Sequence, residues 1–174
     1  MYSTKITSYL SILDSAVDFA RSNLADKETW SSKQIRYQFP HVDRLTIPWG
    51  EFRISLHYIH PCERDKCFIH THPWPSAIRV LSGEYETGFS YSLHGLNGDY
   101  SSGIKVLGSS GFSYEMMDRY SSHYVWTPTG SYSLMLMGPK WENPIPNPVY
   151  QSEGSLSKER EDELFEEFKL IFRK

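Results

Sequence analysis

Four of the seven histidines fall within one short stretch, and two of them stand in the pattern H-x-H. The residues F-I-H-T-H-P-W-P contain this pair as His70 and His72. Because alternate side chains of a β-strand point to the same side, both imidazoles can face one point in space. Neutral imidazole is a ligand of Zn, Fe, Cu and Ni. The pair therefore indicates a metal site, although a single H-x-H is also frequent on protein surfaces.

The sequence around this pair supplies a third histidine in a suggestive context. H-T-H-P is followed by the apolar strand pattern A-I-R-V-L-S-G, which closes at Gly83. Further on, S-H-Y-V-W-T-P-T-G-S-Y-S-L-M-L-M contains His123 at the start of a strand, then a turn and a second strand. Over roughly residues 45–140 this arrangement resembles the cupin superfamily. The resemblance assigns His70 and His72 to the first cupin motif, G-x5-H-x-H-x3,4-E-x6-G, and His123 to the second, G-x5-P-x-G-x2-H-x3-N.

The chain departs from both motifs. The position of the motif glutamate holds Ser76 or Ala77, depending on the spacing, and Thr127 replaces the final asparagine. An alternative register of the second motif uses Pro128 and Gly130 and leaves the site with two ligands. Some cupins bind iron with three histidines alone, so the resemblance implies a three-histidine site. Three neutral imidazoles leave a divalent metal with its full charge, which favours an anionic ligand.

The resemblance implies one divalent transition metal, with Fe preferred and Zn, Ni, Mn or Cu as other candidates. It implies a non-haem iron oxygenase that acts on a small anionic substrate through His70, His72 and His123. Candidate catalytic residues are Tyr58, Tyr124 and Arg79. Two alternatives remain open: a non-catalytic ligand-binding or regulatory cupin, and a cupin-type isomerase or epimerase. The latter would use a histidine base beside a tyrosine acid.

The remaining histidines and the cysteines allow a different site. His57 and His60 lie on opposite faces of one predicted strand, so only one of them can approach the metal. The loop C-E-R-D-K-C places Cys62 and Cys67 in a C-x4-C spacing, which could join His60 or His70 in a zinc knuckle. The loop lacks a C-x2-C turn and the chain has no second cysteine pair. We therefore expect two free thiols on a turn.

Hydrophobic periodicity predicts how these residues are held. Apolar residues recur every three or four positions over 6–25 and 157–173, which predicts a helix at each end. Between them, F-R-I-S-L-H-Y-I-H and several similar segments alternate with period two, separated by Gly, Pro, Asn and Ser. This pattern predicts an all-β sandwich or barrel, and the resemblance implies a cupin-type jelly-roll barrel with an N-terminal and a C-terminal α-helix. Its single domain over 1–174 comprises a helical region (1–42), the barrel (43–139), and a Pro-rich connector with the last helix (140–174).

Composition narrows the function further. The 174 residues carry a net charge of −3, which argues against a nucleic-acid partner. No run of 18 apolar residues suggests a membrane span, and Asp14 and Asp18 interrupt any signal core, so we expect a cytoplasmic protein. The expected partner is a small-molecule ligand. The apolar stripe of the last helix, Phe165, Phe168, Ile171 and Phe172, either covers the protein's own sheet or forms a homodimer.

Overall fold

The computed structural model describes residues 8–91, 104–144 and 154–174. Most of the Pro-rich connector lies outside these ranges. The described elements, in chain order, are η1 (Tyr9–Ile12), α1 (Leu13–Asn23), η2 (Lys27–Thr29), β1 (Ser31–Ile35), β2 (Val42–Trp49), β3 (Phe52–Ile59), η3 (Arg64–Lys66), β4 (His70–Thr71), β5 (Ser76–Ser82), β6 (Tyr85–Tyr91), β7 (Ile104–Gly108), β8 (Ser113–Met116), β9 (Ser121–Trp126), β10 (Ser131–Met137) and α2 (Lys158–Phe172).

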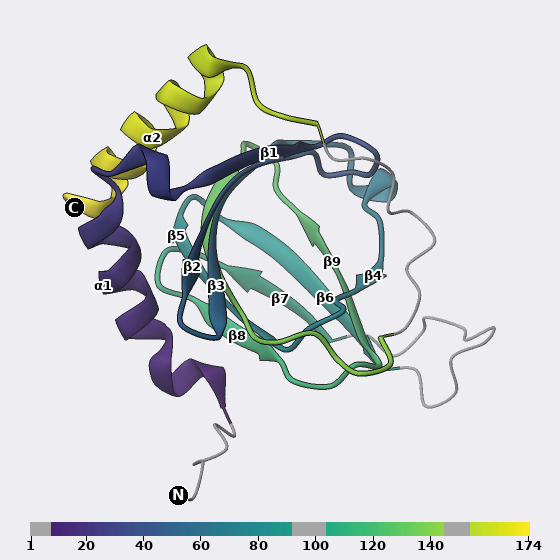
Figure 1. Cartoon of the computed structure of the whole chain (residues 1–174). Coiled ribbons are helices and arrows are strands. Elements are labelled where there is room, and N and C mark those ends of the chain that lie inside the picture. The colour runs from purple at the N-terminus through teal and green to yellow at the C-terminus, as the bar shows by residue number, and fades with distance from the viewer. Residues whose placement is uncertain (1–7, 92–103, 145–153) are drawn as a thin grey trace, which may run out of the picture.

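Two antiparallel sheets face each other. One has the strand order β1-β2-β3-β10-β5-β8 and the other β4-β9-β6-β7. Figure 1 shows both helices on the outer side of the larger sheet, with the smaller sheet on the opposite side of the molecule. The predicted fold class, an all-β jelly roll with a helix at each end, is confirmed. Among the described residues the two sheets share no strand, so they pack as a double layer.

Glycines form the tight turns that fix the strand register. Gly50 has φ 61° between β2 and β3, where Trp49 pairs with Phe52 across a two-residue loop. Gly83 has φ 77° between β5 and β6. A Cβ atom at Gly83 would lie 2.8 Å from the carbonyl oxygen of Gly130, so only glycine fits this turn.

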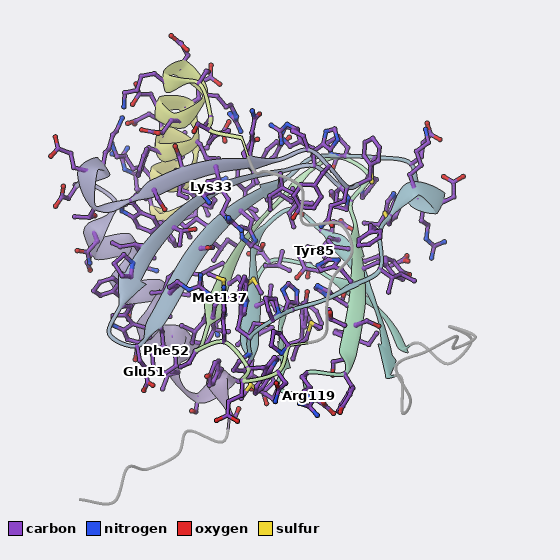
Figure 2. All side chains as sticks on the ribbon, turned by 45° about the vertical axis from the view of Figure 1, so that its right-hand side comes forward. Lys33, Glu51, Phe52, Tyr85, Arg119 and Met137 are labelled. Carbon is purple, nitrogen blue, oxygen red and sulfur yellow. The ribbon has the colours of Figure 1, made fainter. Side chains whose placement is uncertain are left out.

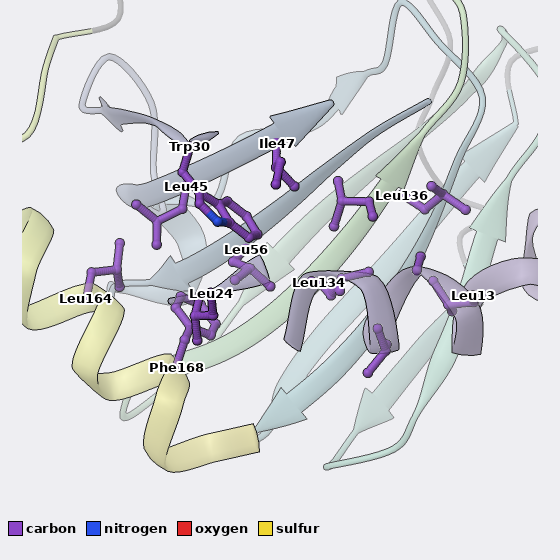
Figure 3. Packing of buried hydrophobic residues seen from close by; sticks show 14 of the residues in the cluster. Leu13, Leu24, Trp30, Leu45, Ile47, Leu56, Leu134, Leu136, Leu164 and Phe168 are labelled. Carbon is purple, nitrogen blue, oxygen red and sulfur yellow. The ribbon is translucent and has the colours of Figure 1, made fainter. Parts of the chain in front are cut away.

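The main hydrophobic core lies between the larger sheet and the two helices. The alternating residues Ile54 and Leu56 of β3 are fully buried on this outer face. Figure 3 shows Leu13 of α1 and Leu164 and Phe168 of α2 packing towards the sheet. Ser157 caps α2, because its side-chain oxygen accepts a hydrogen bond from the backbone N–H of Arg160. The helices thus cover the more apolar face of the sheet.

A second core cluster fills part of the space between the sheets. Its buried residues are Ile59, Ile78, Val80, Tyr85, Tyr114, Met116, Met135 and Met137. The central strand β10 contributes to both cores, since Leu134 and Leu136 face the helices while Met135 and Met137 face the smaller sheet. Because β10 is buried on both faces, strand alternation makes Met135 and Met137 core residues between the two sheets.

Two observations refine the predicted organisation. The larger sheet begins before residue 43, because β1 lies inside the segment expected to be helical and pairs with β2. The stripe on α2 packs on the protein's own core: Phe165 is 1% exposed and Phe168 0%. The homodimer therefore stays a prediction, without this stripe as its interface.

No helix in the described part of the chain combines the length and apolar character that crossing a membrane requires.

Candidate metal centre

The structure brings His70, His72 and His123 together. His70 on β4 pairs directly with His123 on β9, and His72 follows β4. The ring centroids form a nearly regular triangle with sides of 4.9 Å (His70–His72), 4.8 Å (His70–His123) and 5.0 Å (His72–His123). Their potential ligand nitrogens all lie within 4.8 Å of one another. One short strand and its antiparallel partner are thus sufficient to collect three imidazoles.

Neighbouring groups orient two of the three rings. The Nδ1 atom of His70 lies 3.2 Å from the carbonyl oxygen of Phe68, to which it can donate a hydrogen bond. This contact leaves Nε2 of His70 as the free acceptor. The Nδ1 atom of His123 faces the hydroxyls of Thr87 and Tyr114, each 3.4 Å away. Nε2 of His123 is thereby directed at Nε2 of His72, 2.9 Å away.

Burial keeps the three imidazoles neutral. Loss of solvation lowers the pKa of His70, and it lowers the pKa values of His72 and His123 well below the usual range. The proximity of the neighbouring histidines lowers the latter two further, because like charges repel. Neutral imidazole is the form that binds a metal, so the cluster requires no deprotonation at neutral pH.

The geometry of the cluster fits a first-row metal. Two imidazole nitrogens that bind one ion at right angles, each at about 2.1 Å, lie about 3.0 Å apart. The observed separation of 2.9 Å between the Nε2 atoms of His72 and His123 matches that value. Two neutral imidazoles at this distance otherwise share a single proton, since one must donate and the other accept. The donor set and the spacing of this pair therefore fit a divalent transition metal.

No carboxylate completes the cluster among the described residues. Ser76, at the position of the missing glutamate, is fully buried with its hydroxyl unpartnered, and Ala77 packs in the outer core. Arg79, on the same outer face as Ala77, forms an ion pair with Asp14 of α1 and donates to Ser113. Strand β5 therefore sends no ligand and no cation to the cluster, contrary to the expected role of Arg79.

A cavity of about 900 Å³, including the space at its mouth, borders all three histidines. Both sheets supply its apolar wall, which includes Ile59, Ile78, Tyr85, Tyr114, Val125, Met135 and Met137. Tyr85 and Met137, labelled in Figure 2, lie in this region between the sheets. Arg44 also lines the cavity, whereas none of the described lining residues is Asp or Glu. Arg44 is therefore the permanently charged side chain among the described residues that line the cavity.

His57 is a fourth histidine that lines this cavity, a position that the sequence patterns did not predict. It lies beside Arg44 across the β2–β3 pair, and its Nε2 atom is buried without a hydrogen-bond partner. Burial first, and then Arg44, lowers the pKa of His57 to about 3. A signal was present: if Ile54 and Leu56 form the helix-covered face of β3, parity places His57 on the inner face.

The tyrosines expected at the site lie elsewhere. Tyr58 faces α2, where its ring centroid is 4.9 Å from that of Tyr132 and 5.3 Å from the guanidinium carbon of Arg160. Tyr124 donates a hydrogen bond to the buried carboxylate of Glu86, which Arg64 also contacts. Neither lines the cavity. The tyrosines that line the cavity are instead Tyr37, Tyr85 and Tyr114, which no motif singled out.

His60 and the two cysteines do not join a second cluster with three or more ligands among the described residues. The Nε2 atom of His60 lies 3.0 Å from Oδ2 of the buried Asp43. Cys62 and Cys67 are free thiols in the loop around η3. The described residues thus give the zinc-knuckle alternative no third ligand.

No family model matches the chain, and no curated protein matches it. Among solved structures, it resembles an iron(II) form of HppE with the alternative substrate (S)-1-HPP. The TM-score is 0.50 at 13% identity, over 65% of this chain and 57% of that one. An RmlC-like cupin from Shewanella frigidimarina gives a TM-score of 0.48 at 15% identity, over 66% and 88% of the two chains. The match spans little more than half of the HppE chain, and at this identity it shows a shared fold.

Proposed function

We propose that this chain binds one divalent first-row transition metal through His70, His72 and His123 and acts as a non-haem iron oxygenase-like enzyme. The observation that carries the proposal is the convergence of three neutral imidazoles on the wall of a cavity. Three protein ligands and an adjacent cavity are typical of catalytic rather than structural metal sites. The HppE structure of similar fold is described as an iron(II) form, so this architecture can hold iron.

The substrate class follows from charge and shape. Three neutral ligands leave the ion with its full positive charge, and Arg44 adds a further positive charge to the wall. We therefore expect an anionic group, such as a carboxylate, thiolate or enolate, to bind at the metal. The apolar wall opposite offers Ile78, Val125 and Met135 to the rest of the molecule. A small anion with an apolar body fits both features.

The protein's own residues would bind and orient this substrate. When bound, iron(II) supplies a site for the anionic group and the means to react with dioxygen. The histidines fix the position of the anion, and the apolar residues between the sheets limit the access of water. Thr87 and Tyr114 hold the ring of His123 from its Nδ1 side.

A metal-free isomerase is the second candidate, and one contact favours it. The hydroxyl of Tyr114 lies 3.4 Å from Nδ1 of His123, and both groups are buried in the cavity. A histidine base beside a tyrosine acid can move a proton on a bound sugar or keto acid. Burial raises the pKa of Tyr114 to about 12, which keeps its hydroxyl protonated. Activity that survives a chelator would support this candidate. Ligand binding without any turnover would instead support the third alternative, a non-catalytic ligand-binding role.

Oxygen uptake tests the oxygenase directly. Protein purified without a histidine tag is loaded anaerobically with iron(II), then exposed to air-saturated buffer with small thiols, 1,3-diketones and 2-oxo acids. We expect uptake with at least one anion and none with His123→Ala. Leu170→Ala, on the exposed face of α2, is the matched control and should behave as the wild type. Equal oxygen uptake by His123→Ala and Leu170→Ala would contradict a role of the histidine cluster in the reaction.

Three wider expectations accompany this proposal. We propose a single domain over 1–174, a cytoplasmic location and a homodimer. Light scattering at micromolar concentration tests the last: a mass near the 20.3 kDa of one chain would contradict the dimer.

A further inference from the structure

The loop between β3 and β4 carries two thiols that face each other. The Sγ atoms of Cys62 and Cys67 are 3.6 Å apart, and both side chains are half-buried. The proposed metal site uses neither of them. Their partial exposure leaves them accessible to a small reagent, and the short separation makes each sulfur the nearest reaction partner of the other.

The rest of the protein holds this loop in place. The indole N–H of Trp126 donates a hydrogen bond of 2.9 Å to the carbonyl oxygen of Cys62. Between the cysteines, Arg64 reaches Oε1 of the buried Glu86 through Nε (3.0 Å) and Nη2 (2.6 Å). Its guanidinium also lies over the ring of Trp126, at 5.7 Å. The closeness of the two sulfurs is therefore a property of the folded sheet and not only of the short loop.

We propose that Cys62 and Cys67 form a reversible disulfide when the folded protein meets a small-molecule disulfide such as oxidised glutathione. A thiolate attacks one sulfur of the glutathione disulfide and releases one reduced glutathione. The second thiolate then attacks the mixed disulfide and releases the other. Two thiols and one oxidised glutathione thus become one internal disulfide and two reduced glutathiones. The sulfurs must approach by about 1.5 Å to reach the bond length of about 2.05 Å.

The two thiols differ in their surroundings, which sets the order of the steps. Burial and the neighbouring Cys62 raise the pKa of Cys67. The sulfur of Cys67 also lies 3.9 Å from the carbonyl oxygen of Glu63, a weak acceptor for its proton. Cys62 therefore makes the first attack, and Cys67 resolves the mixed disulfide.

This disulfide would lie next to the histidine cluster in the chain. Cys67 forms a backbone bridge with Phe39, and the N–H of Phe68 donates to the carbonyl oxygen of Phe39 at 2.8 Å. Phe68 is the residue whose carbonyl oxygen contacts Nδ1 of His70. Oxidation of the pair would thus fix the segment that presents the first histidine.

Equilibration in glutathione buffers, with a chelator present, tests the proposal. After acid quenching and alkylation, mass spectrometry separates the internal disulfide from glutathione adducts. We expect the folded wild type to lose about 2 Da on oxidation, with Cys62 and Cys67 linked, and to recover with dithiothreitol. The ratio of internal disulfide to adduct should be at least tenfold higher in folded protein than in guanidinium-unfolded protein.

Two variants complete this test. Cys67→Ser should accumulate the glutathione adduct on Cys62. Arg64→Ala removes the hydrogen bonds from Arg64 to Glu86 while leaving both thiols in place. In this variant, the ratio of internal disulfide to adduct in the folded protein should fall towards the ratio in the unfolded protein. A glutathione adduct as the main product of the folded wild type would overturn the proposal. An equal ratio in folded and unfolded protein would overturn it as well.

Discussion

The Nε2 atoms of His72 and His123 lie 2.9 Å apart, although the two residues are separated by 51 positions in the chain. Their closeness depends on β4 pairing with β9, which places His70 opposite His123. A hydrophobic core would tolerate many other side chains at these positions. Three neutral imidazoles directed at one point instead form a set of donors whose common use is metal binding.

His57 distinguishes a three-ligand from a four-ligand site. We expect His57→Leu to bind the same amount of metal as the wild type, because His57 lies outside the group of converging nitrogens. Its buried Nε2 has no hydrogen-bond partner, so replacement by an apolar side chain removes an unsatisfied polar group. The free energy of unfolding should be unchanged or higher, by up to about 1–3 kcal/mol. Elemental analysis checks the metal content, and denaturant titration checks the free energy of unfolding. Loss of the metal in His57→Leu would show that His57 is a ligand.

Metal affinity should depend on pH with a defined sign. Burial lowers the pKa values of His70, His72 and His123 below the ordinary 6.5. Protons therefore begin to compete with the metal only below that pH. We expect a nearly constant dissociation constant for cobalt(II) between about pH 6.5 and 7.5, and weaker binding as the pH falls further. A loss of about sixfold between pH 7.5 and 6.5, as expected for three imidazoles of ordinary pKa, would show that the histidines titrate normally.

Asp43 should control stability in acid. Burial alone would raise its pKa, but hydrogen bonds from His60, Arg160 and Arg36 outweigh burial and hold the pKa well below 3.8. The contribution of a carboxylate with a lowered pKa is complete above the unfolded value, near 3.9, and is lost as the pH falls below it. Asp43→Asn should cost about 1–3 kcal/mol at pH 7, because the half-buried Arg36 and Arg160 lose a charged, buried acceptor.

Denaturant unfolding at pH 7 and pH 3 measures this effect. The difference in unfolding free energy between the wild type and Asp43→Asn should shrink at the lower pH. Asp18→Asn is the matched control. The Asp18 side chain is 71% exposed and, among the described residues, forms an ion pair only with Arg21 of the same helix, so little change is expected. An equal cost for Asp43→Asn at both pH values would contradict the assigned pKa.

The packing of α2 gives a further comparison. Phe168 is 0% exposed, against 58% for Leu170 two positions later. Phe168→Ala should lower the free energy of unfolding by about 3–5 kcal/mol, because it leaves a cavity against the sheet. Leu170→Ala should change it by less than about 0.5 kcal/mol. Similar costs for both variants in chemical denaturation would mean that α2 does not pack as described.

Periodicity and turn residues predicted an all-β sandwich or barrel with a helix at each end, and the motif resemblance added the jelly-roll arrangement. Strand alternation placed Ile54 and Leu56 on one face, and the helical spacing around Leu13 and Phe168 predicted the two covering helices. Periodicity could not show which face of the sheet lies inside the double layer. The helices cover the more apolar face, so the cavity receives the other one, including Arg44 and His57.

The unknown orientation of the strand faces also explains why some residues predicted for the site lie outside the cavity. Tyr58 and Arg79 were assigned to the cavity without knowledge of strand orientation, and both face the helices. Tyr124 neighbours His123 in sequence and therefore points to the opposite side of β9. The three histidines could be grouped in advance because H-x-H depends only on alternation and His123 on the resemblance of its strand-turn-strand context. That they bind a metal stays a prediction.

Metal stoichiometry tests the central claim most directly. Tag-free protein, incubated with cobalt(II) and passed through a desalting column, is assayed by elemental analysis beside His123→Ala and Cys62→Ser. We predict about one ion per chain for the wild type and Cys62→Ser, and at least a tenfold reduction in occupancy for His123→Ala with unchanged far-UV circular dichroism. A wild type without bound metal would contradict the claim. So would a His123→Ala variant that keeps its ion while Cys62→Ser loses it.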